Sequence, residues 1–509
     1  MISLPALIIA AVALFVIYLI KINRDRPENF PPGPPKLPVY GSYWYVLKEN
    51  FQFAHRALDG LAKKYKTDIL GFYLGDTPAV CTFSTELNKE LLTKDEFYGK
   101  AESILTQARG NGKRIGIFFV DGMYWQDQRR FTLRHLRDYG FGRRSENFEQ
   151  FTIDQIQHMM DLLLSDPRPE DKDICRAKGE VLMPDIVYGY FNNLMWYLLS
   201  GRSHDLKTCR DLSRAALGFQ RAGDVLGGAI SITPWLRHIA PTFFGYTSAV
   251  EDNRKMYVYC EEIVKEHMAT YDADHHRDFI DDYIFEINKL ESQGIYNTSF
   301  NVEQMTFIVM DFMFPAPIAM GHTTNFLFGY LVNYPEVQRK IQEEVDLVVG
   351  RGRLPCLDDR KNMHYTEATI REILRKEPAN PLGLTRTSTA DTTLGGYFIP
   401  KGTVVMTNVH SAHNDPKVWG DPENFRPERW IEADGTLTKK DQTLGFGAGK
   451  RVCGGETFAR HTMFLFLSCL LQNFTFLPPK GEQKPDLSKR IFGINISLPD
   501  FWMYAEPRT

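Results

Sequence analysis

The stretch "FGAGKRVCGGETFARH", residues 446–461, places one cysteine among glycines at the start of a helical pattern. Because four glycines flank Cys453, the backbone there can turn tightly and approach a flat partner. The next helix is expected to begin just after Cys453, so its N–H groups and dipole would favour a thiolate. Arg451 could bind an acidic group of the same ligand. The stretch therefore predicts a ligand-binding loop built around a thiolate.

Two simpler interpretations fit this stretch less well. A buried free cysteine is common in proteins, but the glycines and cations around Cys453 are unusual for one. A phosphate-binding loop would need a first glycine at position 444 and Ser or Thr after the lysine. Leu444 and Arg451 stand at those places, so the phosphate-loop pattern fails.

The pattern Phe446-x-x-Gly449-x-Arg451-x-Cys453-x-Gly455 resembles, position for position, the haem-binding loop of the cytochrome P-450 family. The resemblance implies that the cofactor is haem b (iron protoporphyrin IX, heme) and that Cys453 is the metal ligand, as the axial thiolate of the iron. It also implies that Phe446 shields the sulfur and that Arg451 binds a haem propionate.

Glu372-x-x-Arg375 would alone be an ordinary helical ion pair, worth a few tenths of a kcal/mol. Further along the chain, "NFRPERW", residues 424–430, supplies Arg429 in a proline-rich loop. Together these residues resemble the family's Glu–Arg–Arg network, which locks the loop that leads to the haem cysteine.

Trp125 and Arg129 stand one helical turn apart and project from one helix face. They could simply be a cation beside a surface tryptophan. The resemblance instead implies that both bind haem propionates, because the family has Trp-x-x-x-Arg on the corresponding helix. Arg386 matches another propionate-binding position, with a less distinctive pattern.

Apolar residues at three- and four-residue spacing predict a mainly helical chain. The expected helices cover residues 51–65, 125–138, 147–165, 185–201, 251–271, 301–333, 335–349, 365–377 and 454–472. Strand-like runs occur at 68–74, at 78–83 and within 392–408. The predicted fold class is mainly α with a small β region, which is the cytochrome P-450 fold that the resemblance implies.

The N-terminus predicts how the chain is organised. Residues 1–22 hold a 19-residue apolar run followed by basic residues, which is typical of a transmembrane anchor with the rest of the chain in the cytosol. Residues 23–35 form a basic and proline-rich hinge, expected to be stiff and extended. Residues 36–509 would be one haem-thiolate catalytic domain. The expected location is the endoplasmic reticulum membrane, with the catalytic domain facing the cytosol.

Composition limits the partners. The net charge of −3 argues against a nucleic-acid partner, and seven cysteines without CxxC pairs favour a reducing compartment. The helix around residues 125–138 is locally basic. It is either a solvated helix face or a docking surface for an acidic electron donor. The family partners would be NADPH-cytochrome P-450 reductase, with cytochrome b5 as a second candidate donor.

The stretch "MDFMFPAPIAMGHTTNF", residues 310–326, lies in a long helix that is expected to begin at an Asn301 cap and to bend at Pro315 and Pro317. In the family this helix carries an acid and a threonine that deliver protons. Counting back from Pro335, residues 315–320 occupy those positions and contain neither group. A slip by one turn would place His322 there. The ungapped alignment is simpler, so we interpret His322 as a core histidine with satisfied hydrogen bonds.

The resemblance predicts a haem-thiolate monooxygenase that inserts one oxygen atom of O₂ into a lipophilic small molecule, using electrons from NADPH. The atypical long helix keeps an alternative open, a peroxide-rearranging isomerase or dehydratase on the same fold. Apolar stretches near 110–120, 220–235 and 310–322 are expected to line the pocket. "ISITPWLRHIAP", "GRLPCLDDRKN" and "LPDFWM" are most similar to an insect subgroup, family three hundred and four.

Overall fold

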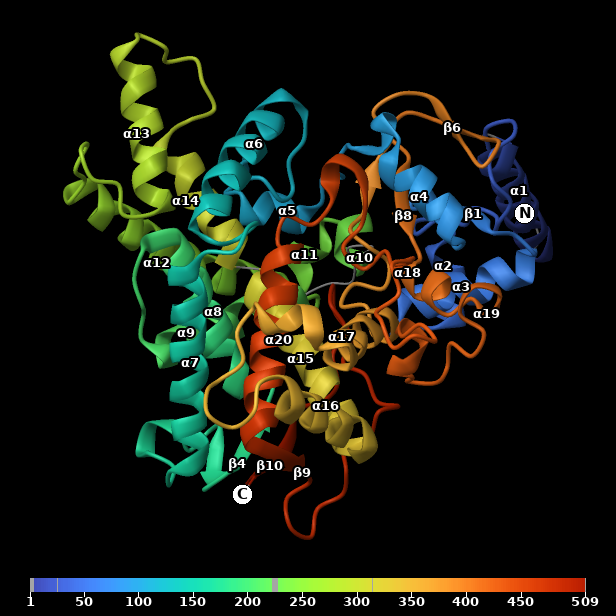
Figure 1. The fold of residues 1–509 in the computed structure, drawn as a ribbon. Helices are drawn as coiled ribbons and strands as arrows, with labels where there is room; N and C mark the ends of the chain where they lie inside the picture. Colours follow the sequence, from blue (N-terminus) through green and yellow to red (C-terminus); the bar gives the residue numbers. More distant parts are fainter. Residues whose placement is uncertain (1–3, 25, 222–227, 314, 509) are drawn as a thin grey trace.

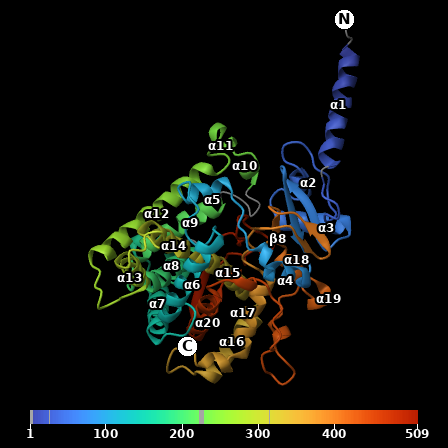
Figure 2. The same cartoon turned by 90° about the horizontal axis from the view of Figure 1, so that it is seen from above.

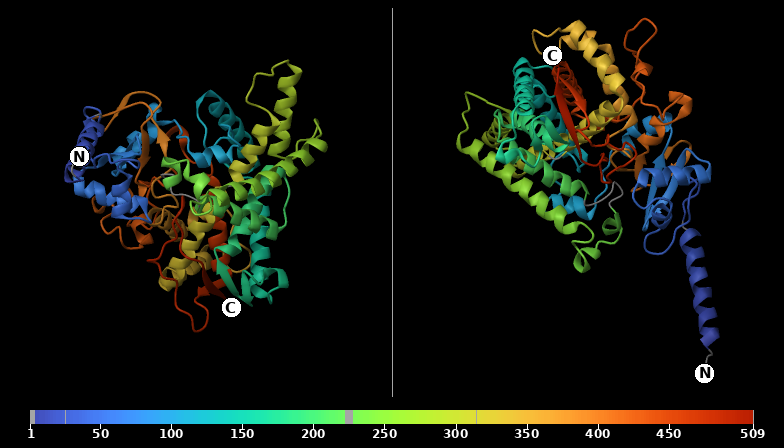
Figure 3. Two further views of the ribbon diagram at one scale, coloured as in Figure 1. Left: turned by 180° about the vertical axis from the view of Figure 1, so that it is seen from behind. Right: turned by 90° about the horizontal axis from the view of Figure 1, so that it is seen from below.

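The computed structural model describes residues 4–24, 26–221, 228–313 and 315–508. Helix α1 (Leu4–Arg24) projects away from the body (Figures 2 and 3). Several of its apolar side chains are exposed, among them Val12, Leu14 and Ile17. This is the predicted anchor segment. Among the described residues, the helical stretch that is long and apolar enough to cross a membrane is Val302–Asn333, and it is mostly buried in the body.

The proline-rich hinge lies on the body. Residues 31–35 form neither helix nor strand, and Gly71 of strand β1 (Ile69–Leu74) donates its N–H to the Pro32 carbonyl at 2.9 Å. Asn23 accepts from the Lys36 N–H at 2.8 Å and donates to its carbonyl at 3.0 Å. These contacts hold both ends of the hinge.

A helical region makes up most of the body (Figure 1). Its longer helices are α6 (Gly122–Tyr139), α7 (Glu146–Leu164), α8 (Asp185–Ser200), α9 (Leu206–Arg221), α12 (Tyr246–Ala269), α13 (Phe279–Ser292), α14 (Val302–Met313), α15 (Ala316–Asn333), α16 (Pro335–Val348), α17 (His364–Lys376) and α20 (Glu456–Asn473). The shorter ones are α5 (Ile104–Arg109), α10 (Gly228–Ile232) and α11 (Leu236–Ile239). Their buried residues form one large hydrophobic core.

The smaller region is built on a sheet with strand order β1-β2-β8-β5. Its strands after β1 are β2 (Thr77–Thr82), β5 (Arg386–Thr387) and β8 (Val404–Thr407), and β2 and β8 run parallel. The helices of this region are α2 (Tyr43–Glu49), α3 (Ala54–Tyr65), α4 (Thr85–Thr93), α18 (Val409–His413) and α19 (Pro416–Trp419). A hairpin of β6 (Thr392–Leu394) and β7 (Tyr397–Ile399) lies in the same part of the chain.

A second four-stranded sheet has the order β3-β4-β10-β9. Its strands are β3 (Cys175–Ala177), β4 (Glu180–Met183), β9 (Phe474–Leu477) and β10 (Phe501–Pro507). Short 3₁₀ turns are η1 (Asp95–Phe97), η2 (Pro169–Asp171), η3 (Asp359–Asn362), η4 (Pro427–Trp430) and η5 (Gly449–Arg451). The predicted fold class, mainly α with small sheets, is confirmed.

The long helix is divided as the prolines predict. Asn301 accepts the N–H of Gln304 at 2.9 Å, which caps the start of α14. Helix α14 ends at Met313, and α15 begins at Ala316 with Pro315 as its N-cap residue. Proline lacks an N–H group and clashes with the preceding turn, so the ladder of hydrogen bonds is interrupted here.

Candidate haem site

The cysteine loop connects η5 to the start of α20. Cys453 donates its backbone N–H to the carbonyl of Phe446 at 2.9 Å, which closes the loop. Gly449 adopts a φ of +71°, and a Cβ there would lie 2.5 Å from the Leu92 carbonyl oxygen. Only glycine fits this close approach. The residues around Cys453 thus form a tight loop whose backbone fixes the position of Cys453.

Cys453 is exposed to solvent, but its thiol is partly desolvated by the surrounding protein. The residue is exposed, yet protein atoms surround it so densely that burial raises the pKa of its thiol. The Gly455 N–H and Arg129 act in the opposite direction. Burial therefore acts against the stabilisation of a thiolate that the helix N-terminus is expected to give. A coordinated metal ion would hold the sulfur deprotonated.

The three predicted propionate-binding arginines lie close together. Besides burial, the charges of Arg386 and Arg129 lower the pKa of Arg451. Each arginine donates to backbone carbonyls. Arg451 donates through Nη2 to the carbonyls of Tyr98 at 2.9 Å and Val120 at 2.8 Å. Arg386 donates to the Leu92 carbonyl at 3.0 Å, and Arg129 donates to Val452. The Arg451 guanidinium carbon lies 3.5 Å from the centre of the Trp125 ring.

Lys100 is a fourth cation in this cluster, and it belongs to no motif that would single it out in the sequence. Its Nζ donates to the Thr385 carbonyl at 3.3 Å. Burial, and then the charges of Arg451 and Arg386, hold the pKa of Lys100 well below its usual range. Burial also lowers the pKa of Arg451 to about 9 and that of Arg386 to about 10. We call Lys100, Arg129, Arg386 and Arg451 the cation cradle.

The cation cradle lacks negative charge. Asp121 is the one carboxylate, within the described residues, that acts on the pKa of Lys100 and Arg451. It also pairs with Arg114 at 2.8 Å. Arg386 is buried, and Lys100, Arg129 and Arg451 are half-buried. Because four partly desolvated cations beside one carboxylate are costly, this cluster suits a ligand with two acidic groups. The indole Nε1 of Trp125 and Nε of Arg451 are buried and have no hydrogen-bond partner among the described residues. The residues present thus fit a haem with its propionates here.

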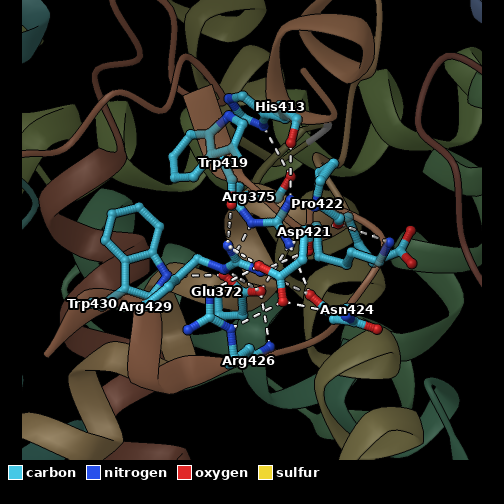
Figure 4. Close-up of polar contacts among 12 residues, drawn as sticks. Glu372, Arg375, His413, Trp419, Asp421, Pro422, Asn424, Arg426, Arg429 and Trp430 are labelled. Carbon is cyan, nitrogen blue, oxygen red and sulfur yellow. Dashed lines mark hydrogen bonds and ion pairs between the residues drawn. The ribbon is translucent and has the colours of Figure 1, made fainter. Parts of the chain in front are cut away.

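The Glu–Arg–Arg network forms as predicted (Figure 4). Glu372 accepts from Arg375 at 2.8 and 3.0 Å and from Nε of Arg429 at 3.1 Å. The Trp430 indole and the Arg426 backbone N–H donate to the same carboxylate at 2.9 and 3.0 Å. We call these five residues the Glu372 network. Both Glu372 and Arg375 are fully buried, so this is a structural core and not an exposed helical pair.

His413 joins the Glu372 network to the cysteine loop, and sequence reasoning missed it. Its Nδ1 lies 2.9 Å from the Arg375 carbonyl, and its Nε2 accepts the N–H of Leu444 at 2.8 Å. These two bonds require a neutral ring that is protonated on Nδ1. Burial lowers the pKa of His413 to about 3, in agreement with a neutral ring. Leu444 lies two residues before Phe446, so the network reaches the loop through one imidazole.

Phe446, which is predicted to shield the sulfur, lies beside α20. Its ring is half-buried, and the Arg460 guanidinium carbon lies 5.1 Å from its centre. Arg460 itself pairs with Glu456 of the first turn of α20 at 2.9 Å. The Phe446 ring of the cysteine loop is therefore in contact with Arg460 of α20.

The long helix holds the loop at residues 110–120 through a buried pair that sequence reasoning missed. Asp311 of α14 forms an ion pair with Arg109 of α5, and both side chains are buried. The same carboxylate accepts from the backbone N–H groups of Ile117 at 2.6 Å and Phe118 at 3.2 Å. Two apolar stretches that were expected to line the pocket are thus fixed to each other.

His322 is buried, and the expectation that its hydrogen bonds are satisfied is wrong. Neither ring nitrogen has a partner among the described residues. Its ring faces Tyr188 of α8, with ring centres 6.3 Å apart, and burial lowers its pKa to about 3. Thr323 donates to the Ala319 carbonyl at 2.9 Å, as expected for a threonine inside a helix.

The basic residues that begin in α6 lie on an exposed face. Arg130, Arg134, Arg137, Arg143 and Arg144 make up this set. Arg144 is paired with Glu149 at 2.5 Å and Asp358 at 2.7 Å. Part of the positive charge is therefore compensated within the protein.

Comparisons with known proteins agree with this site. A model of the cytochrome P450 family matches residues 31–500. Farnesoate epoxidase of Bombyx mori is 32% identical over 507 residues, which cover 99% of this chain and 98% of that protein. Cytochrome P450 2J2 of Homo sapiens is 30% identical over 510 residues, covering 99% and 96%. Cytochrome P450 2L1 of Panulirus argus is 32% identical over 465 residues, covering 90% of each. The chain therefore belongs to the cytochrome P450 family, as a monooxygenase that carries haem on a cysteine thiolate.

Proposed function

We propose that this monooxygenase oxidises a lipophilic small molecule with electrons that NADPH supplies through NADPH-cytochrome P-450 reductase. In this proposal Cys453 is the iron ligand, Phe446 shields it, and the cation cradle with Trp125 binds the propionates. The observation that carries the assignment is the cradle itself, because four cations meet one carboxylate beside an accessible sulfur.

When bound, the haem supplies an iron centre whose thiolate ligand favours O–O cleavage. The chain supplies the geometry around it. The Gly455 N–H is directed at the Cys453 sulfur, where it would lower the charge on a thiolate. The N–H of Trp125 and the Nε–H of Arg451, which have no partner among the described residues, would donate to propionate oxygens and so help to hold the group.

The substrate class is proposed from two supports. The name of the Bombyx mori relative, farnesoate epoxidase, specifies a lipophilic acid for that protein. In this chain the stretches 110–120 and 310–322 hold buried apolar residues such as Ile117, Met310 and Phe312. Of the third stretch, 220–235, residues 222–227 lie outside the described residues. We infer a substrate with an extended apolar part.

Proton delivery has to differ from the usual acid–threonine pair. Ile318 and Ala319 stand where the ungapped alignment expects the pair. Thr323, one turn later, already donates to the Ala319 carbonyl. We therefore propose that water or a substrate hydroxyl supplies the protons.

We propose the endoplasmic reticulum membrane as the location, with residues 1–22 as anchor, 23–35 as hinge, and the domain 36–509 facing the cytosol. The exposed apolar side chains of α1 support the anchor, and the basic face from Arg130 to Arg144 is the proposed docking surface for the reductase or cytochrome b5. Membership of the insect family three hundred and four stays a prediction, since the relatives named above do not test it.

The test is turnover of a panel of terpenoids, steroids, fatty acids and plant toxins by the purified full-length protein. One arm supplies NADPH, reductase and O₂, and the other supplies only a hydroperoxide. We expect product with a stoichiometric use of NADPH in the first arm. Activity confined to the hydroperoxide arm would instead establish the isomerase or dehydratase alternative, which the relatives do not favour.

A further inference from the structure

A cavity of about 280 Å³ lies apart from the haem site. It is enclosed by α3, α15, the end of α17, α18 and the segment at residues 487–496, and no residue of the cysteine loop or the cation cradle lines it. Its volume is near the lower end of the range for small-molecule sites. Its lining is mostly polar and charged, unlike that of a pocket for a lipophilic substrate.

Positive charge exceeds negative charge in this cavity. Arg56, Lys376 and Arg490 line it together with Glu377 and Glu423. Glu377 is already neutralised, because it accepts from Arg490 and from the Tyr330 hydroxyl at 2.7 Å. Arg56 and Glu423 are exposed and mark the mouth. Within the described residues, Arg56 has no ion pair and Lys376 donates only to the Pro422 carbonyl, at 3.3 Å.

Two imidazoles face the same space. The rings of His55 and His410 lie with their centres 4.9 Å apart, and His55 is 4% exposed. Within the described residues, no hydrogen bond is formed by a ring nitrogen of either residue, and both residues line the cavity. Each neutral ring therefore has one N–H that no described residue accepts.

We propose that this cavity binds a small polyvalent anion, through phosphate or carboxylate groups that contact Arg56, Lys376 and the N–H groups of His55 and His410. The geometry favours an anion over a cation, because the carboxylate at the inner wall is occupied and the free groups are donors. The geometry also favours a small molecule over a peptide, because a cavity of about 280 Å³ has room for only a few chemical groups. This proposal is independent of the monooxygenase reaction.

Anion binding should be coupled to proton uptake. Burial and then the charge of His410 lower the pKa of His55 to about 2, with Arg56 and Arg490 adding to the shift. Burial and then Arg56 lower the pKa of His410 to about 4, while Asp59 opposes this and Lys376 and Arg490 add to it. A bound anion would offset these cations and raise both pKa values. Binding then becomes tighter as the pH falls.

The experiment uses the full-length haem protein in detergent, with inorganic phosphate and citrate as probes and sodium chloride at matched ionic strength as reference. Calorimetric titration gives the affinity, and thermal unfolding gives a second readout. We expect saturable binding of at least one probe. Tighter binding of phosphate identifies phosphate groups as the recognised chemistry, and tighter binding of citrate identifies carboxylates. Absence of saturable binding of both would overturn the proposal.

Two variants locate the site. Arg56→Gln and Lys376→Gln should each weaken binding at least fivefold, whereas Lys64→Gln, the same charge change on the exposed part of α3, should change it less than twofold. Sulfate, which does not titrate between pH 7 and pH 5, tests the proton coupling, and its affinity should rise at least threefold over that range as His410, whose pKa is about 4 in the free protein, takes up a proton. Equal losses in all three variants, or a pH-independent sulfate affinity, would contradict the site as described.

Discussion

The Glu372 network and the cation cradle are two clusters of cationic side chains that differ in how their charge is balanced. In the network, one carboxylate accepts from two arginines, an indole and a backbone N–H. In the cradle, four cations donate to backbone carbonyls and meet one carboxylate that is shared with Arg114. Glu372 and Arg375 of the network are fully buried, whereas in the cradle Arg386 is buried and the other three cations are half-buried.

This difference separates a structural core from a binding site. A buried ion cluster that is complete within the protein holds its segments together, and the loss of one member is costly. A cluster that is incomplete has perturbed pKa values and unpartnered donors, which are the marks of a functional site. The network positions the cysteine loop, and the cradle would bind the acidic groups of the haem. Substitutions in the two clusters should therefore behave in opposite ways.

The largest effect is expected from Cys453→Ser, which removes the sulfur that both clusters position. The reduced carbon-monoxide difference spectrum should lose the band of thiolate-ligated haem, and turnover should fall below about a thousandth. Cys356→Ser, a half-buried cysteine in a different loop, is the matched control and should keep the band. Retention of the thiolate band in Cys453→Ser would show that another cysteine ligates the iron.

Glu372→Gln tests the complete cluster. It leaves Arg375 and Arg429 buried without their counter-charge, so the free energy of unfolding should fall by about 3–5 kcal/mol, with or without haem. Urea unfolding followed by circular dichroism measures this. Glu343→Gln breaks an exposed pair with Arg339 and should cost less than about 1 kcal/mol. Comparable losses in the two variants would mean that the network does not stabilise the fold.

Acid should break the complete cluster through His413. Its pKa is about 3 in the folded chain and about 6.5 when unfolded. Between these values the unfolded chain binds more protons, so stability falls as the pH drops from 6.5 towards 3 and is unaffected above 6.5. The contribution is about 1.4 kcal/mol per pH unit.

Equilibrium unfolding at pH 7, 6 and 5 checks this expectation. His413→Asn should have a shallower pH dependence than the unmodified protein, because one neutral buried ring is gone. The exposed His275 provides the control, His275→Asn, whose slope should match that of the unmodified protein. A His413→Asn protein with an unchanged slope would exclude His413 as the titrating group.

Local patterns in the sequence predicted the parts of the site that carry local constraints. Gly449 is required because a Cβ there would lie 2.5 Å from the Leu92 carbonyl oxygen, so at this position the motif and the geometry have one cause. The Glu372, Arg375 and Arg429 spacing has a similar cause, since a helix and a proline-rich turn fix those side chains. Helix α13 was not among the predicted helices, although Asp278 caps it by accepting from the N–H groups of Ile280 and Asp281.

The rest of the site depends on contacts between segments far apart in the chain. Lys100 and Arg386 are separated by 286 positions yet influence each other's charge. His413 acts through Arg375 and Leu444, which come from different elements. Asp311 meets Arg109 across 202 positions. Lysine, histidine and aspartate have ordinary roles at most positions, so a single sequence gives no reason to select these three.

Lys100→Met tests the incomplete cluster and should have the smallest effect. Unlike substitutions in the network, it should not lower the free energy of unfolding of the haem-free protein. Without haem, loss of a buried, repelled cation leaves the free energy of unfolding unchanged or higher, because Arg386 and Arg451 are relieved. With haem, loss of one charge-assisted contact to a propionate should speed haem dissociation about tenfold, which equals about 1.4 kcal/mol. Haem transfer to an excess of apomyoglobin measures the rate, and Lys89→Met, an exposed lysine of α4, should leave it unchanged. A Lys100→Met protein destabilised in both states, as Glu372→Gln should be, would place Lys100 with the structural cluster and remove the distinction between the two.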